Sequence, residues 1–253
     1  MASDNISTNL RSSYHRRHNY TIQFFGQSLD IAVTSNSRTV KSWIGKSLHI
    51  HRRRLRLYCQ PSIIVGLGTQ WCSFRSNTCP ATIQICVGHR ILIFQILHSR
   101  SIPTSLSRLL SDSRITFAGY NIEYDCRLLR SFHGLRVTSS VVELRSVSGM
   151  GNASMERMAE RILGFHGVNK PSWIANSDWD AQELSVDQVQ YAALDAYLSF
   201  QLGVRLVTRP AGTVRTEQNA VYYCNAVFAL SESEEEVNGD SYSGDSSSME
   251  NGW

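Results

Sequence analysis

Residues 65 to 71 read Val65-Gly66-Leu67-Gly68-Thr69-Gln70-Trp71. With the apolar residues just before it, this stretch forms an apolar, β-branched run, Ser62–Trp71, that predicts a strand at the centre of a sheet. The Gly66-x-Gly68 pair is not a dinucleotide-binding fingerprint, because no third glycine follows and no helix pattern begins there. The run therefore predicts a buried strand without a dinucleotide-binding loop.

On both sides of this strand, runs with the alternation of strands are joined by runs with the periodicity of helices. The predicted strands are Tyr20–Gly26, Leu29–Val33, Ser62–Trp71, Thr82–Val87, Arg90–Ile96, Ile115–Gly119 and Val141–Leu144. The predicted helices are Thr39–Leu48, Pro103–Leu110, Ile122–Phe132, Ser154–Phe165 and Ser185 to about Val207. Strands that come first as a meander and then alternate with helices predict an α/β fold, a mixed β-sheet flanked by helices.

Two later pieces of sequence accompany the central strand. One reads Phe117-Ala118-Gly119-Tyr120-Asn121-Ile122-Glu123-Tyr124-Asp125, and the other leads from Ser177-Asp178-Trp179-Asp180 to Gln188-Val189-Gln190-Tyr191-Ala192-Ala193-Leu194-Asp195-Ala196-Tyr197. In order and spacing the three pieces resemble the three motifs of the DEDDy 3'→5' exonucleases. The chain is most similar to the Werner-syndrome-type exonuclease domain, in the short single-domain form found in plants. The resemblance covers residues 18 to 207 and implies a ribonuclease-H-like (DnaQ-like exonuclease) fold.

The resemblance implies a site in which four acids hold two divalent cations, Mg²⁺ or Mn²⁺, for phosphodiester hydrolysis. Asp125 matches the acid of the second motif, and Tyr191 and Asp195 match the third motif. Because they are four residues apart, Tyr191 and Asp195 share one face of a helix. The first motif of the family reads Asp-x-Glu, and its acidic positions are Gly68 and Gln70 here.

Two negative charges are thus missing from the implied metal cluster. Each is worth about 4 kcal/mol at contact distance with an effective dielectric constant near 20, so we expect Mg²⁺ or Mn²⁺ to bind weakly or not at all unless other acids compensate. The candidates for compensation are Glu123, Glu143 and a neighbouring subunit.

Each matching residue also has a structural interpretation. A first-turn aspartate such as Asp125 is favoured by the helix dipole, and Tyr191 could be an ordinary core tyrosine. Asp195 stands among apolar residues, so its carboxylate needs a metal, a cation or hydrogen-bond donors.

Charge is distributed unevenly along the chain. Residues 1–228 carry all 25 Lys and Arg against 14 acids, a net charge of +11, and residues 229–253 carry seven acids and no Lys or Arg. A basic body favours a polyanionic partner, although such an imbalance can also be solvated surface, and the resemblance implies that this partner is single-stranded RNA or DNA. The candidate nucleic-acid-binding residues are Arg52, Arg53, Arg54 and Trp71, although the basic run could also be a nuclear-import signal or a solvated loop.

The composition along the chain also predicts how it is divided into segments. We expect a disordered arm over residues 1–18, an exonuclease-like domain over 19–207, and a C-terminal extension over 208–253 that is acidic and disordered from about 231. The six cysteines show no C-x-x-C pair, so we expect reduced thiols and neither a disulfide framework nor a zinc site. No apolar run is long enough to cross a membrane, and we expect the protein in the nucleus or cytoplasm.

Three functional hypotheses follow. The first is a 3'→5' exonuclease on single-stranded RNA or DNA whose activity is reduced by the loss of the Asp-x-Glu motif. The second is a catalytically inactive pseudo-exonuclease that retains the fold and binds nucleic acid. The third is a structural subunit that joins active paralogues in a mixed ring, since the short plant members resemble ring-shaped homo-oligomers.

Overall fold

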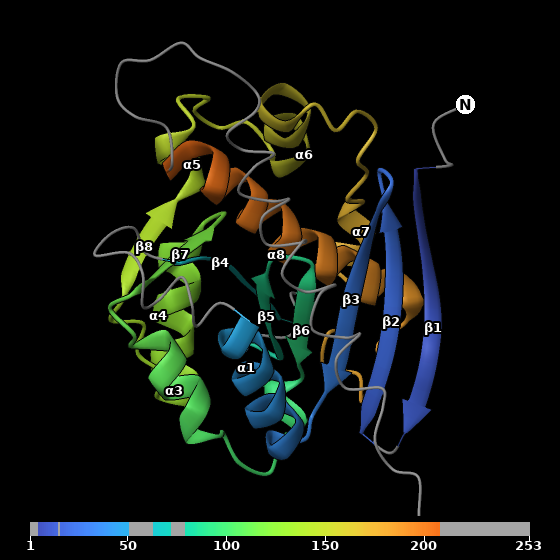
Figure 1. Cartoon of the computed structure of the whole chain (residues 1–253), viewed down its shortest axis with the longest axis vertical. Helices are drawn as coiled ribbons and strands as arrows, with labels where there is room; N and C mark the ends of the chain where they lie inside the picture. The colour runs from blue at the N-terminus through green and yellow to red at the C-terminus, as the bar shows by residue number, and fades with distance from the viewer. Residues whose placement is uncertain (1–4, 15, 51–62, 72–78, 208–253) are drawn as a thin grey trace, which may run out of the picture.

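The computed structural model describes residues 5–14, 16–50, 63–71 and 79–207 (Figure 1). The basic run with Arg52, Arg53 and Arg54 and the C-terminal extension 208–253 lie outside these ranges. Their predicted roles therefore stay predictions.

Eight strands form one mixed sheet in the order β1-β2-β3-β6-β5-β4-β7-β8. The strands are β1 (Ile6–Tyr14), β2 (Arg17–Phe24), β3 (Gln27–Thr34), β4 (Ile63–Gln70), β5 (Thr82–Val87), β6 (Arg90–Phe94), β7 (Ile115–Gly119) and β8 (Ser140–Glu143). β1 to β3 are an antiparallel meander, and β3, β6, β4, β7 and β8 all point the same way. The carboxyl ends of these five strands therefore lie along one edge of the sheet.

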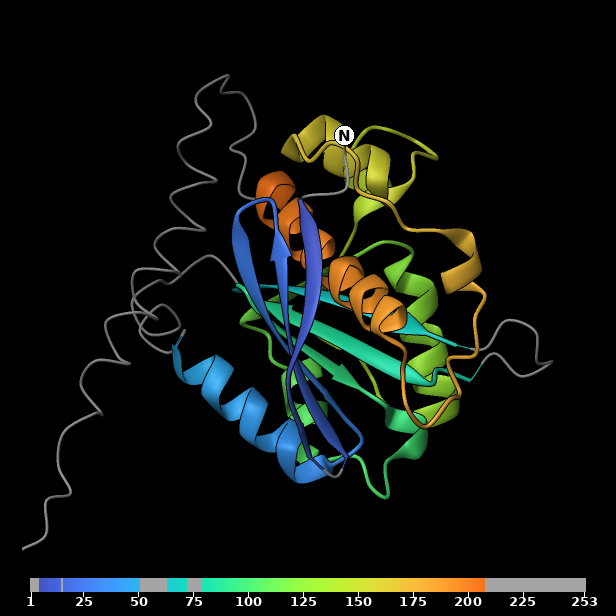
Figure 2. The same ribbon diagram turned by 90° about the vertical axis from the view of Figure 1, so that its right-hand side faces the viewer.

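Helices cover both faces of this sheet. They are α1 (Ser37–Ile50), η1 (Ile96–His98), α3 (Thr104–Leu110), α4 (Ile122–His133), α5 (Leu144–Val147), α6 (Met155–Met158), the π-helical turn η2 (Ala159–Leu163), α7 (Ser172–Ala175) and α8 (Val186–Val207). Figure 2 shows α8 on one face of the sheet and α1 on the other. No helix in the described part of the chain has the length and apolar character needed to span a bilayer.

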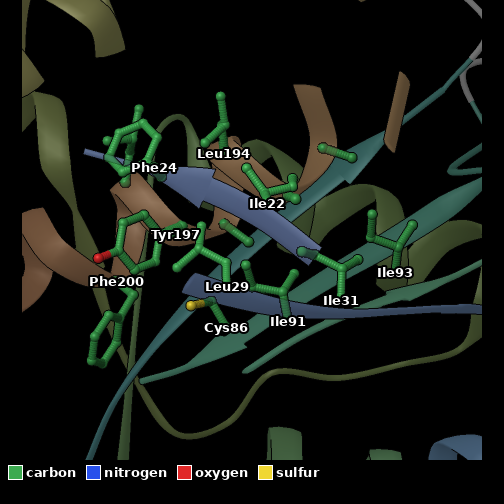
Figure 3. Packing of buried hydrophobic residues seen from close by; sticks show 14 of the residues in the cluster. Ile22, Phe24, Leu29, Ile31, Cys86, Ile91, Ile93, Leu194, Tyr197 and Phe200 are labelled. Carbon is green, nitrogen blue, oxygen red and sulfur yellow. The ribbon is translucent and has the colours of Figure 1, made fainter. Parts of the chain in front are cut away.

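Each face of the sheet has its own hydrophobic core. On the α8 face, side chains of β2 and β3 interlock with those of the helix, as Ile22, Phe24, Leu194 and Tyr197 do in Figure 3. On the other face, α1, α3 and α4 pack against β4, β5 and β7. Most side chains of α8 are buried, and the helix predicted from Ser185 to about Val207 is confirmed.

α8 crosses the sheet so closely that two glycines are required at the contact. A Cβ on Gly66 in β4 would lie 2.0 Å from the carbonyl oxygen of Ala196, and one on Gly203 in α8 would lie 2.5 Å from the Cβ of Ala118. Backbone can approach this closely only where no side chain intervenes. This close contact brings the first turns of α8 next to the end of β4.

The predicted α/β fold is confirmed, and the main correction concerns the N-terminus. The expected disordered arm over residues 1–18 contains the edge strand β1, which pairs with β2 along its length. The composition of β1 does not predict a strand because most of its side chains are exposed. The strand is ordered by its backbone hydrogen bonds to β2 and by the Thr8 hydroxyl, which donates to Gln190 Oε1 at 2.7 Å. The short helices α5 and α7 were also not predicted, since four residues carry no readable period.

Candidate active-site cleft

A cavity of about 330 Å³ opens where β4 ends, beside the start of α4 and the first turns of α8. Its walls contain the side chains of Thr69, Gln70, Asp125, Lys170, Tyr191 and Asp195. All the predicted residues of the second and third motifs therefore face one cavity. It lies at the sheet edge that collects the carboxyl ends of the parallel strands, a usual position for binding sites in α/β proteins.

Asp125 lies in the first turn of α4, at the bottom of the cavity. Asn121, in the left-handed conformation with φ of 60°, ends the preceding turn and starts the helix. The Asp125 side chain is buried, and its Oδ1 accepts a hydrogen bond of 2.8 Å from the Thr69 hydroxyl. Burial raises the pKa of Asp125 well above its usual value, and the negative charges of Asp195 and Glu143 add to the rise, while the bond from Thr69 opposes it. The protonated form of this acid is thus favoured.

Asp195 is surrounded by donors from the protein itself. Lys170 Nζ donates to Oδ1 and forms an ion pair with it, and Gln70 Nε2 donates to Oδ2 at 3.3 Å. The side chains of Lys170 and Asp195 are only 5% and 20% exposed, so this pair is largely shielded from water. A lysine ammonium therefore neutralises the carboxylate that the resemblance assigns to a metal.

Tyr191 lies one helical turn before Asp195 on the same face of α8, as the spacing predicts. The Lys170 ammonium lies 4.2 Å from the centre of its ring, a cation–π distance. Burial and then the charge of Asp195 raise the pKa of the Tyr191 hydroxyl. The hydroxyl is therefore a neutral hydrogen-bond donor at physiological pH.

Gly68 leaves a small space next to Asp195. A Cβ built at Gly68 would lie 3.2 Å from Asp195 Oδ2 and 3.3 Å from Gln84 Oε1. Gln84 is fully buried, and its Oε1 has no hydrogen-bond partner in the described part of the chain. The space that an acidic side chain would fill is thus bordered by two oxygens and contains no third acid.

The proposed compensating acids do not face this cavity. Glu143 Oε1 accepts hydrogen bonds from the backbone N–H groups of Asn121 and Arg145, at 3.0 and 3.2 Å, and so holds the starts of α4 and α5. Glu123 is exposed on α4 and is not part of the cavity wall. The prediction that either acid completes the site is therefore not supported by their positions.

The donor set does not fit a pair of divalent cations. Among the described residues, no group of three or more His, Cys, Asp and Glu side chains is placed to hold a metal ion. Of the two acids in the cluster, Asp125 favours protonation and Asp195 already pairs with Lys170. Hard cations need several anionic oxygens that are free to coordinate them.

The sequence predicts one further residue of the cavity wall and misses two others. Trp71, predicted to contact nucleic acid, lines the cavity with its ring 5.6 Å from that of Tyr124. Lys170 and Glu156 also line it and were not predicted. Both come from the segment between α5 and α8, whose path over the cavity depends on tertiary packing and carries no local signal.

Comparisons with known proteins show which family the sequence is similar to. The model of the 3'-5' exonuclease domain family matches residues 65–209. A 3'-5' exonuclease of Arabidopsis thaliana is 33% identical over 151 residues, which cover 54% of this chain and 50% of that protein. The exonuclease 3'-5' domain-containing protein 2 of Mus musculus is 27% identical over 181 residues, 66% of this chain and 27% of that protein. The chain thus spans half or less of the length of these two relatives.

Solved structures share the fold. NrnC of Brucella melitensis aligns with a TM-score of 0.51 at 21% identity, covering 71% of this chain and 89% of that one. RNase D of Escherichia coli also aligns with a TM-score of 0.51, at 18% identity, covering 77% of this chain and 47% of that one. The fold is therefore the ribonuclease-H-like fold of these exonucleases, as predicted. With its family model matched across β4, α4 and α8, the chain belongs to the 3'-5' exonuclease domain family.

Proposed function

We propose that this protein binds single-stranded RNA or DNA in the cleft and hydrolyses it from the 3' end only weakly, as a DEDDy-type exonuclease with a degenerate first motif. The observation that carries the proposal is the environment of Asp195. Lys170 and Gln70 donate hydrogen bonds to this carboxylate, and Gly68 supplies no acid beside it.

The loss of metal affinity follows from charge. The resemblance implies that four carboxylates hold the metal pair. The acids of the second and third motifs that line this cleft are Asp125 and Asp195, and the ammonium of Lys170 is already paired with Asp195. An incoming divalent cation would meet a cluster whose acids are partly neutralised already. Each missing carboxylate removes about 4 kcal/mol of attraction with an effective dielectric constant near 20.

Binding of nucleic acid does not depend on the missing acids. A structure of NrnC with a similar fold has pGG bound, which supports the same kind of ligand for this cleft. Trp71 and Tyr191 supply aromatic surface to the cavity wall, and bases stack on such surfaces without sequence preference. The net charge of +11 over residues 1–228 adds long-range attraction for phosphates.

The test compares binding with turnover in the same protein. A 3'-labelled single-stranded oligonucleotide is incubated with purified protein in Mg²⁺, in Mn²⁺ and in a chelator, with Asp195→Asn as the control. We expect binding that persists in the chelator and degradation far slower than that by a family member with an intact Asp-x-Glu motif. Rapid metal-dependent degradation that Asp195→Asn abolishes would show that the cleft is a fully competent nuclease site.

A further inference from the structure

A second cavity, of about 300 Å³, lies where β3 ends and α1 begins. Figure 1 shows these two element ends at the lower edge of the molecule. Three arginines from separate segments line it. Arg16 comes from the turn between β1 and β2, Arg38 from the first turn of α1, and Arg100 from the loop after η1. Such convergence concentrates positive charge in a concave site.

No acid in the described part of the chain pairs with this charge. Within residues 5–14, 16–50, 63–71 and 79–207, none of the three arginines forms an ion pair with an Asp or Glu. Asn36, Ser37 and Arg38 line the cavity, so the positive end of the 14-residue helix α1 also lies at it, and the first turn of this helix contains no acidic residue. Arginine clusters and helix N-termini both favour phosphate oxygens.

Polar residues complete the wall of this cavity, and hydrogen bonds hold several of them in place. Asn36 Oδ1 accepts from the backbone N–H of Arg38 at 2.9 Å, and the Ser37 hydroxyl lies 3.0 Å from that of Ser101. Ser35 lines the cavity as well and is only 8% exposed. Serine hydroxyls in a wall shared with three arginines are further hydrogen-bond donors for an anionic oxygen.

We propose that this three-arginine pocket binds a phosphate group. Arginine suits this role because its planar guanidinium stays charged and can donate two parallel hydrogen bonds to a phosphate. The phosphate could belong to the backbone of a nucleic-acid strand whose 3' end lies in the cleft, or to a free phosphate or nucleotide. The strand alternative rests on the proposed function, and the free-phosphate alternative does not.

The position of the pocket favours a strand that reaches both sites. The ladder pairs Thr34 of β3 with Phe94, Phe94 with Ile83, and Ile83 with Thr69 of β4. Thr34, at the end of β3 beside the pocket, and Thr69, in the wall of the cleft, are therefore three inter-strand steps of about 4.8 Å apart along the same edge of the sheet, or roughly 14 Å. A strand of a few nucleotides can cover this span.

The first arm of the test uses inorganic phosphate alone. We expect phosphate to raise the melting temperature of the full-length protein in a concentration-dependent way, and Arg38→Gln/Arg100→Gln to lose that part of the rise. Both side chains are exposed and make no ion pair or side-chain hydrogen bond with another described residue, so the variant should fold. Lys41→Gln/Arg108→Gln removes the same charge from exposed positions outside the pocket and should keep the full rise.

The second arm uses single-stranded oligonucleotides of three and of ten nucleotides in a chelator. If a backbone phosphate occupies the pocket, Arg38→Gln/Arg100→Gln weakens binding of the ten-mer about tenfold and leaves the three-mer unchanged. The slope of log affinity against log salt for the ten-mer also falls by about 0.7 for each phosphate that the variant no longer neutralises.

The arms separate the possible outcomes. A phosphate effect without a length effect assigns the pocket to a free phosphate or nucleotide. Failure of every oligonucleotide to bind, with the phosphate effect intact, contradicts the proposed function and leaves the pocket standing. If the arginine variant matches the Lys41→Gln/Arg108→Gln control in both arms, the phosphate pocket is refuted.

Discussion

At the scale of single residues, the chemistry of the cleft is decided by what surrounds Asp195. The sequence predicts that Tyr191 and Asp195 point the same way, because helical spacing fixes that relation. It also marks Gly68 and Gln70 as departures from the family motif. It does not reveal that Lys170, 25 positions before Asp195, is the cation beside it. That pairing depends on how the segment between α5 and α8 folds back over the cavity.

The Lys170–Asp195 pair should behave as a coupled unit. Lys170→Gln leaves a largely buried carboxylate without its cation, so we expect a loss of about 3 kcal/mol in the free energy of unfolding, as for other buried pairs broken on one side. Adding Asp195→Asn to Lys170→Gln should recover most of that loss. Denaturant unfolding of the two single variants and the double variant measures the coupling. Additive losses would mean that the two side chains do not stabilise each other.

His89, at the turn between β5 and β6, should make stability depend on pH. Burial lowers its pKa from 6.5 to about 4 in the folded protein. As the pH falls from 6.5 to 4, the unfolded chain therefore takes up a proton that the folded chain refuses, and stability is lost. The partly exposed ring is screened by solvent, so we expect about 1–2 kcal/mol.

Thermal unfolding of wild type and His89→Gln between pH 4 and pH 7.5 checks this. The variant should lose less stability than wild type below pH 6.5, and the two should differ little in their pH dependence above it. Parallel profiles over the whole range would contradict the role of His89.

At the scale of elements, the placement of α8 against β4 builds the site. The sequence predicts both elements, since each is long and strongly patterned. It predicts β1, α5 and α7 poorly, because an exposed edge strand and four-residue helices are ordered by their neighbours rather than by their own pattern. The glycines at the crossing are visible in the sequence, yet only the structure shows which backbone approaches them.

Gly66 should tolerate no side chain. In Gly66→Ala the new Cβ would meet backbone atoms of Ala196 and Phe200 at 2.0 and 2.8 Å, so α8 must move away from the sheet. We expect a loss of about 3 kcal/mol or more. Gly45→Ala, in the exposed part of α1 with no atom within 4 Å, is the matched control and should gain up to about 1 kcal/mol. Equal stability of the two variants in urea unfolding would contradict the close crossing.

At the scale of the whole molecule, an exonuclease fold carries two sites of opposite design along one sheet edge. In the cleft, burial favours the neutral form of Asp125 and Lys170 pairs with Asp195, whereas no described Asp or Glu pairs with the arginines of the second pocket. The sequence predicts the net positive charge of residues 1–228 but not its convergence, because Arg16, Arg38 and Arg100 meet only through the packing of three separate segments.

Calorimetric titration with Mn²⁺ shows whether the cleft holds divalent cations as a site with the intact family motif would. We expect no saturable binding by wild type up to millimolar Mn²⁺. Gly68→Asp/Gln70→Glu should bind at least about a hundredfold more tightly, because it restores two charges beside Asp195, where the nearest atoms to a new Cβ are side-chain oxygens of Asp195 and Gln84 at 3.2 and 3.3 Å. Saturable micromolar binding of Mn²⁺ by wild type, lost in Asp195→Asn, would contradict this account.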